Sequence, residues 1–232
     1  MSNSRRILAI GRGLNRTIIK HFVQLTGKKE PRICMIPTAS ADDPRLINLW
    51  HEMGHNYGFD SYVLPLFISS FDQSESFESV LSSMDAIYVG GGNTVNMLAV
   101  WQAHGIDTLL RRLYDDGVLM GGGSAGGICW FEGGLTDSRP VELTAMTAMG
   151  WLRGSFAPHY LSEPGRRQYY HKYVLSGELQ DGFAADDTVG LFFENEQLVR
   201  AVGSAPDAEA YSVTNVDGRI IEQPLEVQLI EE

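Results

Sequence analysis

The chain has 232 residues, of which 44% are hydrophobic and 20% charged, a composition typical of a globular protein with a sizeable core. Its 18 lysines and arginines against 29 acidic residues give a formal charge of −11, which argues against nucleic acid or an anionic membrane as the main partner. Two cysteines, Cys34 and Cys129, are too few for a disulfide framework, and we expect both to be buried.

Five short apolar runs alternate with segments of helical periodicity in the first half of the chain. Strands are expected over residues 7–10, 33–36, 62–64, 86–89 and 118–120, and helices over 17–25, 44–57, 77–83 and 94–116. The first run is too short for a signal sequence, and no run reaches the roughly 20 apolar residues of a membrane span. The alternation predicts an α/β fold, a mostly parallel sheet flanked by helices on both faces, in a cytoplasmic protein.

The last part of the chain has a different pattern. Short alternating runs over 189–193, 198–202, 211–213 and 219–221, with a turn at 217–218, predict antiparallel strands that complete or flank the sheet. No linker or repeat interrupts the chain, so one domain over residues 1–232 is the simplest organisation.

A G-x-S-x-G motif at residues 122–126 is the strongest catalytic signal. It lies between the expected strand over 118–120 and an expected helix over 125–131, and a serine on such an elbow presents its hydroxyl above the sheet. Ser124 is therefore the candidate nucleophile. A phosphate-binding glycine loop, or a turn without chemistry, is the alternative.

A second glycine loop, Gly90-Gly91-Gly92-Asn93, ends the preceding strand. The backbone N–H groups of Gly91 and Gly92, with that of Ala125, are candidates for an oxyanion hole. The alternative is a helix entry with Asn93 as N-cap.

A hydroxyl nucleophile needs a base and an acid that orients the base. Among six histidines, His159 stands out because it follows Pro158 in an aromatic segment that disfavours helix. Candidate acids are Asp137 and the pair Asp186 and Asp187.

A metal or nucleotide cofactor is not expected. Residues 51–55 match H-E-x-x-H, but Gly54 weakens the helix that would place His51 and His55 on one face, and no third ligand follows at a recognisable spacing. The loop Gly11-Arg12-Gly13 lacks the third glycine of a dinucleotide fingerprint.

Four segments together resemble the peptidase E family of serine peptidases, which includes aspartyl dipeptidases and cyanophycinases: residues 90–94, 123–127, 136–138 and 157–160. The resemblance implies a fold similar to class I glutamine amidotransferases and hydrolysis of a peptide bond near a free N-terminus. It assigns Ser124 as nucleophile, His159 as base and Asp137 as the acid. Asp187, one of the candidate acids above, is the reserve for Asp137.

Substrate specificity is the open part of this assignment. Asn93, Arg166 and Arg167 are the candidate substrate-binding residues, although the two arginines also suit a solvated helix start. Between Ser124 and Asp137 there is no arginine or lysine to hold an aspartate side chain, and Glu132 would repel one, so a requirement for N-terminal aspartate does not follow.

The sequence thus predicts a serine exopeptidase acting on dipeptides or short peptides. Three alternatives stay open: a cyanophycinase-like hydrolase, a metallopeptidase that uses His51 and His55, and a non-catalytic binding module of the same fold. A small peptide is the expected partner, and a homodimer is compatible with the sequence.

Overall fold

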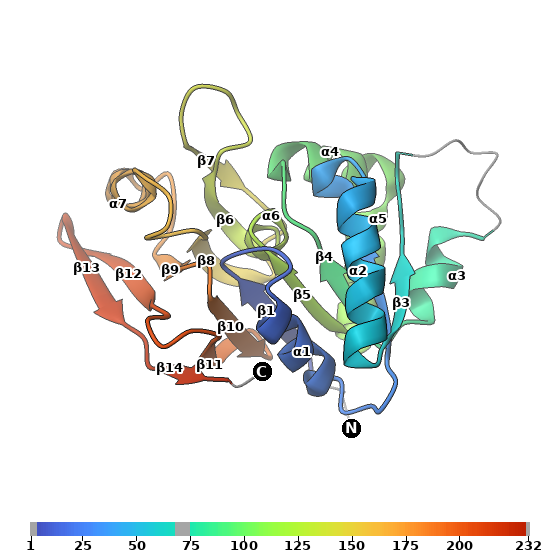
Figure 1. Cartoon of the computed structure of the whole chain (residues 1–232). Helices are drawn as coiled ribbons and strands as arrows, with labels where there is room; N and C mark the ends of the chain where they lie inside the picture. The colour runs from blue at the N-terminus through green and yellow to red at the C-terminus, as the bar shows by residue number, and fades with distance from the viewer. Residues whose placement is uncertain (1–3, 68–74, 231–232) are drawn as a thin grey trace.

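The computed structural model describes residues 4–67 and 75–230 (Figure 1). Its strands are β1 (Arg6–Ile10), β2 (Arg32–Ile36), β3 (Asp60–Val63), β4 (Ala86–Val89), β5 (Leu119–Gly123), β6 (Phe131–Thr136), β7 (Thr144–Thr147), β8 (Leu152–Ala157), β9 (Gly182–Ala185), β10 (Val189–Glu194), β11 (Gln197–Gly203), β12 (Ala210–Val216), β13 (Arg219–Pro224) and β14 (Val227–Leu229). Its helices are α1 (Arg16–Leu25), α2 (Pro44–Tyr57), α3 (Phe77–Ser82), α4 (Thr94–His104), α5 (Ile106–Asp115), α6 (Ala125–Ile128) and α7 (Arg166–Ser176), with a 3-10 turn over Thr38–Ser40. Among the described helices, none has the length and apolar character to span a bilayer.

The larger sheet has the strand order β14-β11-β10-β1-β5-β4-β2-β3. Strands β1 to β5 are mutually parallel, while β10 pairs antiparallel with β1 and β11 antiparallel with β10. The expected α/β fold, with a mostly parallel sheet and antiparallel strands near the C-terminus, is confirmed.

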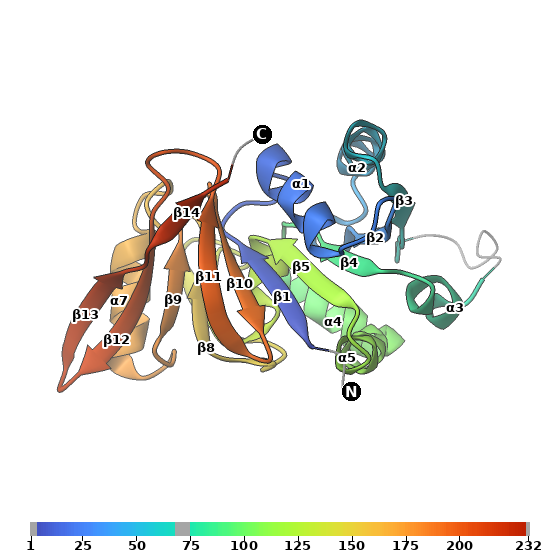
Figure 2. The same cartoon turned by 90° about the horizontal axis from the view of Figure 1, so that it is seen from below.

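Helices cover both faces of the larger sheet, with α1 and α2 on one side and α4 and α5 on the other (Figure 2). In β1, Leu8 and Ile10 belong to the same core cluster as Trp50 of α2, whereas Ile7 belongs to the cluster of Trp101 in α4. Because both faces are buried, the parallel strands are continuous apolar runs rather than alternating ones.

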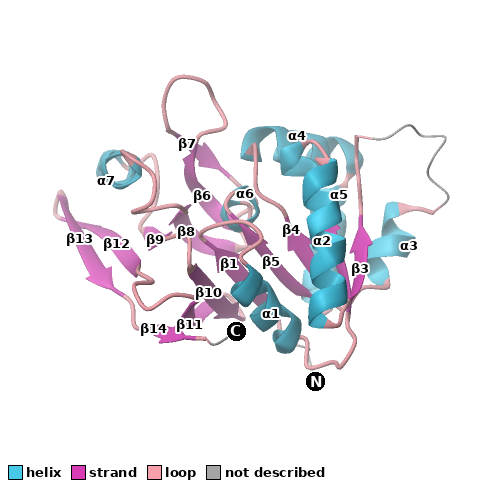
Figure 3. Cartoon of the chain, viewed as in Figure 1, coloured by secondary structure: helices cyan, strands magenta, loops and turns pink. Residues whose placement is uncertain are grey.

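A smaller sheet, with the order β13-β12-β9-β8-β6-β7, lies beside the larger one (Figure 3). Helix α7 packs on one face of the smaller sheet. On the other face, the rings of Phe131 and Phe156 stack on each other, and Phe131 packs edge-on against Phe193 of β10. These contacts join the smaller sheet to the core of the larger one. The C-terminal strands therefore divide between two sheets instead of only extending one.

Two expected helices end earlier than the sequence pattern indicated. The helix expected over 94–116 is interrupted at Gly105, whose φ of +69° ends α4 and starts α5. The helix expected over 125–131 is only the short α6, because Phe131 already begins β6.

Candidate active site

Three glycine-containing loops meet at the carboxyl ends of three adjacent strands. Residues 11–13 follow β1, residues 90–93 follow β4, and Ser124 follows β5, the strand that pairs with both. A pocket of about 250 Å³ opens between them. Its lining residues include Ser124, His159, Arg12 and the glycines Gly90, Gly91 and Gly92. Ligand sites in open α/β sheets lie at this edge.

Ser124 occupies a strained turn between β5 and α6. Its φ of +56° and ψ of −117° are unusual for a residue with a side chain, and its N–H donates to the carbonyl of Ile10 at 3.0 Å. A Cβ on Gly126 would lie 2.2 Å from the carbonyl oxygen of Val89, so this position of the motif excludes any side chain. Ser124 therefore lies on a tight, strained turn between a strand and a helix, the position that a G-x-S-x-G motif predicts for its serine.

His159 connects Ser124 to a carboxylate. Its Nε2 lies 2.9 Å from Ser124 Oγ and its Nδ1 lies 2.5 Å from Asp187 Oδ1, and its side chain is 12% exposed. With the ring proton on Nδ1, His159 donates to Asp187 and Nε2 accepts from the Ser124 hydroxyl. This tautomer is the one that suits a general base.

Asp137, the acid that the resemblance to the peptidase E family implies, does not contact His159. Its side chain is 63% exposed, and its Oδ2 lies 3.4 Å from Nη2 of Arg166. The preceding residue, Thr136, ends β6 with its side chain buried against Ser138, so Asp137 continues on the outside. The contact with His159 is made instead by Asp187, the reserve candidate.

Strand pairing explains why Asp187 reaches His159. Strands β8 and β9 are parallel neighbours, with Ala157 opposite Ala184, and His159 and Asp187 follow their respective carboxyl ends. Asp186 does not bond His159. Its Oδ1 accepts hydrogen bonds from the N–H groups of Leu161 and Ser162 in the loop after His159. Neither β8 nor β9 is predicted from the sequence, so the sequence pattern does not indicate that the two loops are adjacent.

The surroundings of Asp187 favour its ionised form. Burial alone would raise the pKa of this carboxyl, but hydrogen bonds from His159 and Ser162 and the charge of Arg12 outweigh it, and the net pKa is lowered. Nη1 of Arg12 lies 3.0 Å from Asp187 Oδ2, the oxygen that His159 leaves free.

The glycine loop after β4 lies against the serine. A Cβ on Gly91 would be 3.2 Å from the Cβ of Ser124. Within residues 4–67 and 75–230, no protein acceptor bonds the backbone N–H of Gly91, Gly92 or Ala125. These three amides are therefore free to donate to a substrate oxygen.

Asn93 is engaged within the protein. Its Oδ1 accepts the N–H of Asn96 at 2.9 Å, which caps α4, and its Nδ2 donates to the carbonyl of Ser138 at 3.0 Å. The side chain predicted to bind substrate is thus the helix cap that the alternative interpretation described.

Comparison with known proteins identifies the family to which the chain belongs. The family model described as peptidase family S51 matches residues 7–201. The chain belongs to peptidase family S51. It is 38% identical to the uncharacterized peptidase YgaJ of Bacillus subtilis, over 97% of this chain and 99% of that protein. It is 30% identical to peptidase E of Shewanella denitrificans, over 61% of this chain and 63% of that protein, so the resemblance to peptidase E is confirmed.

The fold comparison agrees with this membership. A crystal structure of a peptidase from an acI-B1 Actinobacterium superposes with a TM-score of 0.70, covering 98% of this S51 chain and 95% of that one. At 18% identity the likeness concerns the fold alone.

The two arginines predicted to bind substrate in this S51 chain lie outside the pocket lining. Arg166 is buried, with its Nε 2.6 Å from Glu163 Oε2. Arg167 pairs with Glu222. Glu132, expected near the substrate, instead accepts the N–H of Gly154 at 2.8 Å and lines a different hollow.

The H-E-x-x-H segment lies on the outer surface of α2. His51 and His55 are exposed, and Nδ1 of His51 is 2.9 Å from Ser61 Oγ. In the part of the chain that the structure describes, no group of three or more histidine, cysteine or acidic side chains is placed to hold a metal ion.

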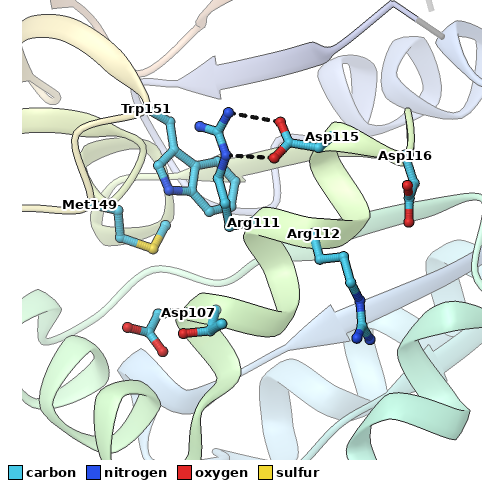
Figure 4. A pocket seen from close by; sticks show the side chains of 8 residues that line it. Asp107, Arg111, Arg112, Asp115, Asp116, Met149 and Trp151 are labelled. Atoms are coloured by element: carbon cyan, nitrogen blue, oxygen red, sulfur yellow. Dashed lines mark hydrogen bonds and ion pairs between the residues drawn. The ribbon is translucent and has the colours of Figure 1, made fainter. Parts of the chain in front are cut away.

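A wider hollow, of about 500 Å³, lies beside α5 (Figure 4). Arg111 stacks on Trp151 there and forms an ion pair with Asp115, while Arg112 pairs with Glu78. The described lining residues hold no nucleophile with a neighbouring base, and neither Ser124 nor His159 is among them. Ser124 and His159 instead line the smaller pocket.

Proposed function

We propose that this chain is a serine exopeptidase that hydrolyses dipeptides or short peptides, with Ser124, His159 and Asp187 as its triad. One observation carries the proposal: the unbroken hydrogen-bond chain from Asp187 through His159 to Ser124, which ends in a pocket. Membership of a peptidase family supports it.

The reaction uses groups that are already in position. Ser124 Oγ attacks the scissile carbonyl carbon while His159 Nε2 accepts the hydroxyl proton, and Asp187 stabilises the imidazolium that forms. Amides of Gly91, Gly92 and Ala125 donate to the carbonyl oxygen as it becomes an oxyanion. His159 then protonates the leaving amine, and a water deprotonated by His159 hydrolyses the acyl-enzyme.

The size of the pocket favours a short substrate. At about 250 Å³ it lies below the roughly 300–1,000 Å³ of sites for drug-sized ligands. One or two amino-acid residues fill such a space, whereas a folded polypeptide would need an open cleft.

A dipeptide panel assayed with the wild type, Ser124→Ala and Ser83→Ala tests the proposal. We expect Ser124→Ala to lose at least about 1,000-fold in kcat, while Ser83→Ala, a change at the C-terminus of α3, keeps wild-type activity. A serine-directed phosphonate should label the wild type at Ser124 and leave Ser124→Ala unlabelled.

The alternatives give different results in the same assay. Loss of activity with a chelator and with His51→Ala, together with resistance to the phosphonate, would establish the metallopeptidase. Absence of both labelling and hydrolysis would indicate a binding module. A branched Asp-Arg polymer in the panel tests the cyanophycinase-like activity.

A further inference from the structure

The active-site pocket combines apolar walls with one permanently charged side chain. Leu14, Met35 and Leu46 contribute apolar surface, and Arg12 is the one arginine or lysine among the described lining residues. A protein of net charge −11 repels an anionic substrate at long range, so a carboxylate needs a local cation of this kind.

Arg12 is fixed at both ends. A Cβ on Gly123 would lie 2.4 Å from the backbone oxygen of Arg12, so the loop after β1 packs directly on the last residue before Ser124. At the other end, Nη1 of Arg12 donates to Asp187 Oδ2 at 3.0 Å. The guanidinium is therefore held beside the catalytic groups.

Most of the guanidinium is still available. A guanidinium carries five N–H donors, and in the described chain its Nε and Nη2 have no protein acceptor. The side chain is 65% exposed. Arg12 can therefore bind a second carboxylate while keeping its contact with Asp187.

The position of Arg12 relative to His159 indicates which carboxylate this is. The two carboxylate oxygens of Asp187 bond His159 and Arg12, so Arg12 lies on the histidine side of the pocket. In a serine peptidase the histidine protonates the leaving nitrogen, so the leaving residue lies on that side as well. In a dipeptide, the α-carboxylate of that residue is only about 3 Å from the leaving nitrogen.

We propose that Arg12 binds the free α-carboxylate of the leaving amino acid and thereby makes dipeptides the preferred substrates. This inference rests on the proposed function of Ser124 and His159. Leu14, Met35 and Leu46 supply an apolar wall for an aliphatic side chain. Arg12, not Arg166 or Arg167, is then the residue that determines specificity.

The test compares two substrates that differ only in that carboxylate, alanyl-leucine and alanyl-leucinamide. We expect the wild type to prefer the free acid by about 10- to 100-fold in kcat/KM, the range of a charge-assisted hydrogen bond. Arg12→Gln should bring the preference close to one, and Arg12→Lys should keep part of it. A tripeptide, whose carboxylate lies farther away, should be a poorer substrate.

Arg16 provides the matched control. It is also 65% exposed, but it pairs with Glu52 at 3.7 Å and does not line the pocket. Arg16→Gln should leave the preference unchanged. Removing Arg12 also disturbs Asp187, but that effect lowers the rate with both substrates and cancels in their ratio.

Binding of the same two compounds to Ser124→Ala, with and without Arg12→Gln, separates this inference from the proposed function. If Ser124→Ala binds the free acid more tightly and Arg12→Gln abolishes the difference, Arg12 has the assigned role even where hydrolysis fails. A wild type without preference, or an Arg12→Gln variant that retains it, overturns the inference. So does an Arg12-dependent preference for aspartyl-leucinamide over alanyl-leucinamide, because the arginine would then bind the first residue.

Discussion

Asp187 and His159 follow the ends of two adjacent parallel strands, and their side chains meet at 2.5 Å between Oδ1 and Nδ1. Asp187 is the only carboxylate within hydrogen-bonding distance of His159 among the described residues, since Glu163 Oε1 lies 3.9 Å from the same nitrogen. Asp137 pairs with Arg166 instead. We therefore expect neutralising Asp187 and neutralising Asp137 to have different effects on kcat.

Asp187→Asn should reduce kcat by about 1,000- to 10,000-fold, because an amide can donate to Nδ1 and stabilise the wrong tautomer of His159. Asp137→Asn removes only a partner of Arg166, which keeps Glu163, and should cost less than about 10-fold. Steady-state kinetics on a cleaved dipeptide decides between them. A larger loss in Asp137→Asn than in Asp187→Asn would contradict the assignment.

Asn93 is predicted to anchor the glycine loop rather than bind substrate. Asn93→Ser keeps a side-chain oxygen that can cap α4, whereas Asn93→Ala removes it and should cost about 1 kcal/mol, or roughly 2–4 °C in Tm. The melting temperatures of the two variants, measured at pH 7, test this. Equal stability of all three proteins, with KM raised in both variants, would instead support direct binding.

The sequence predicted the parts of the fold that are dominated by burial. Strands such as β4 are buried on both faces. Helix α2 begins at Pro44 after the Asp43 cap and ends at Tyr57 before the Gly58 cap, so composition and capping located these elements. Strands β6 and β8 were missed because glycines and polar residues interrupt them, and no period-two pattern results.

The missed strands also explain which residues of the candidate site could be predicted from the sequence and which could not. Ser124 and His159 carry local signals, the elbow motif and the proline before the histidine. The acid carries none, because which aspartate reaches His159 depends on the pairing of β8 with β9. Arg12 has no local signal either, since its role comes from the close approach of its loop to Gly123.

Gly126→Ala should disrupt the elbow. The new Cβ would lie 2.2 Å from the carbonyl oxygen of Val89, so β4 or the turn at Ser124 must shift, which costs about 1–3 kcal/mol. We expect both Tm and kcat to fall. Gly90→Ala is the control for stability, because its Cβ meets ordinary contacts at 3.7 Å. Unchanged Tm and kcat in Gly126→Ala would show that the elbow tolerates a side chain.

Glu222 of β13 connects this strand to α7 and to Tyr160, the residue after His159. Its carboxylate accepts from Tyr160 and Arg167, and Oε1 lies 2.9 Å from His171 Nε2. Burial raises the pKa of this carboxyl, but the hydrogen bonds from Arg167, Tyr160 and His171 outweigh burial and lower it overall.

Because the folded pKa of Glu222 is depressed, its contribution to stability is complete above the unfolded value of about 4.3 and is lost as the pH falls through the folded value. Glu222→Gln should therefore lower Tm by roughly 2–8 °C at pH 7. The difference from the wild type should shrink steadily below about pH 4.3. Thermal melts of the wild type and Glu222→Gln between pH 3 and 7 measure this difference. Glu209→Gln is the control and should have a small effect, because among the described residues the carboxylate of Glu209 accepts only from Tyr211. A Tm difference that stays constant down to pH 3 would mean that the charge of Glu222 does not stabilise the fold.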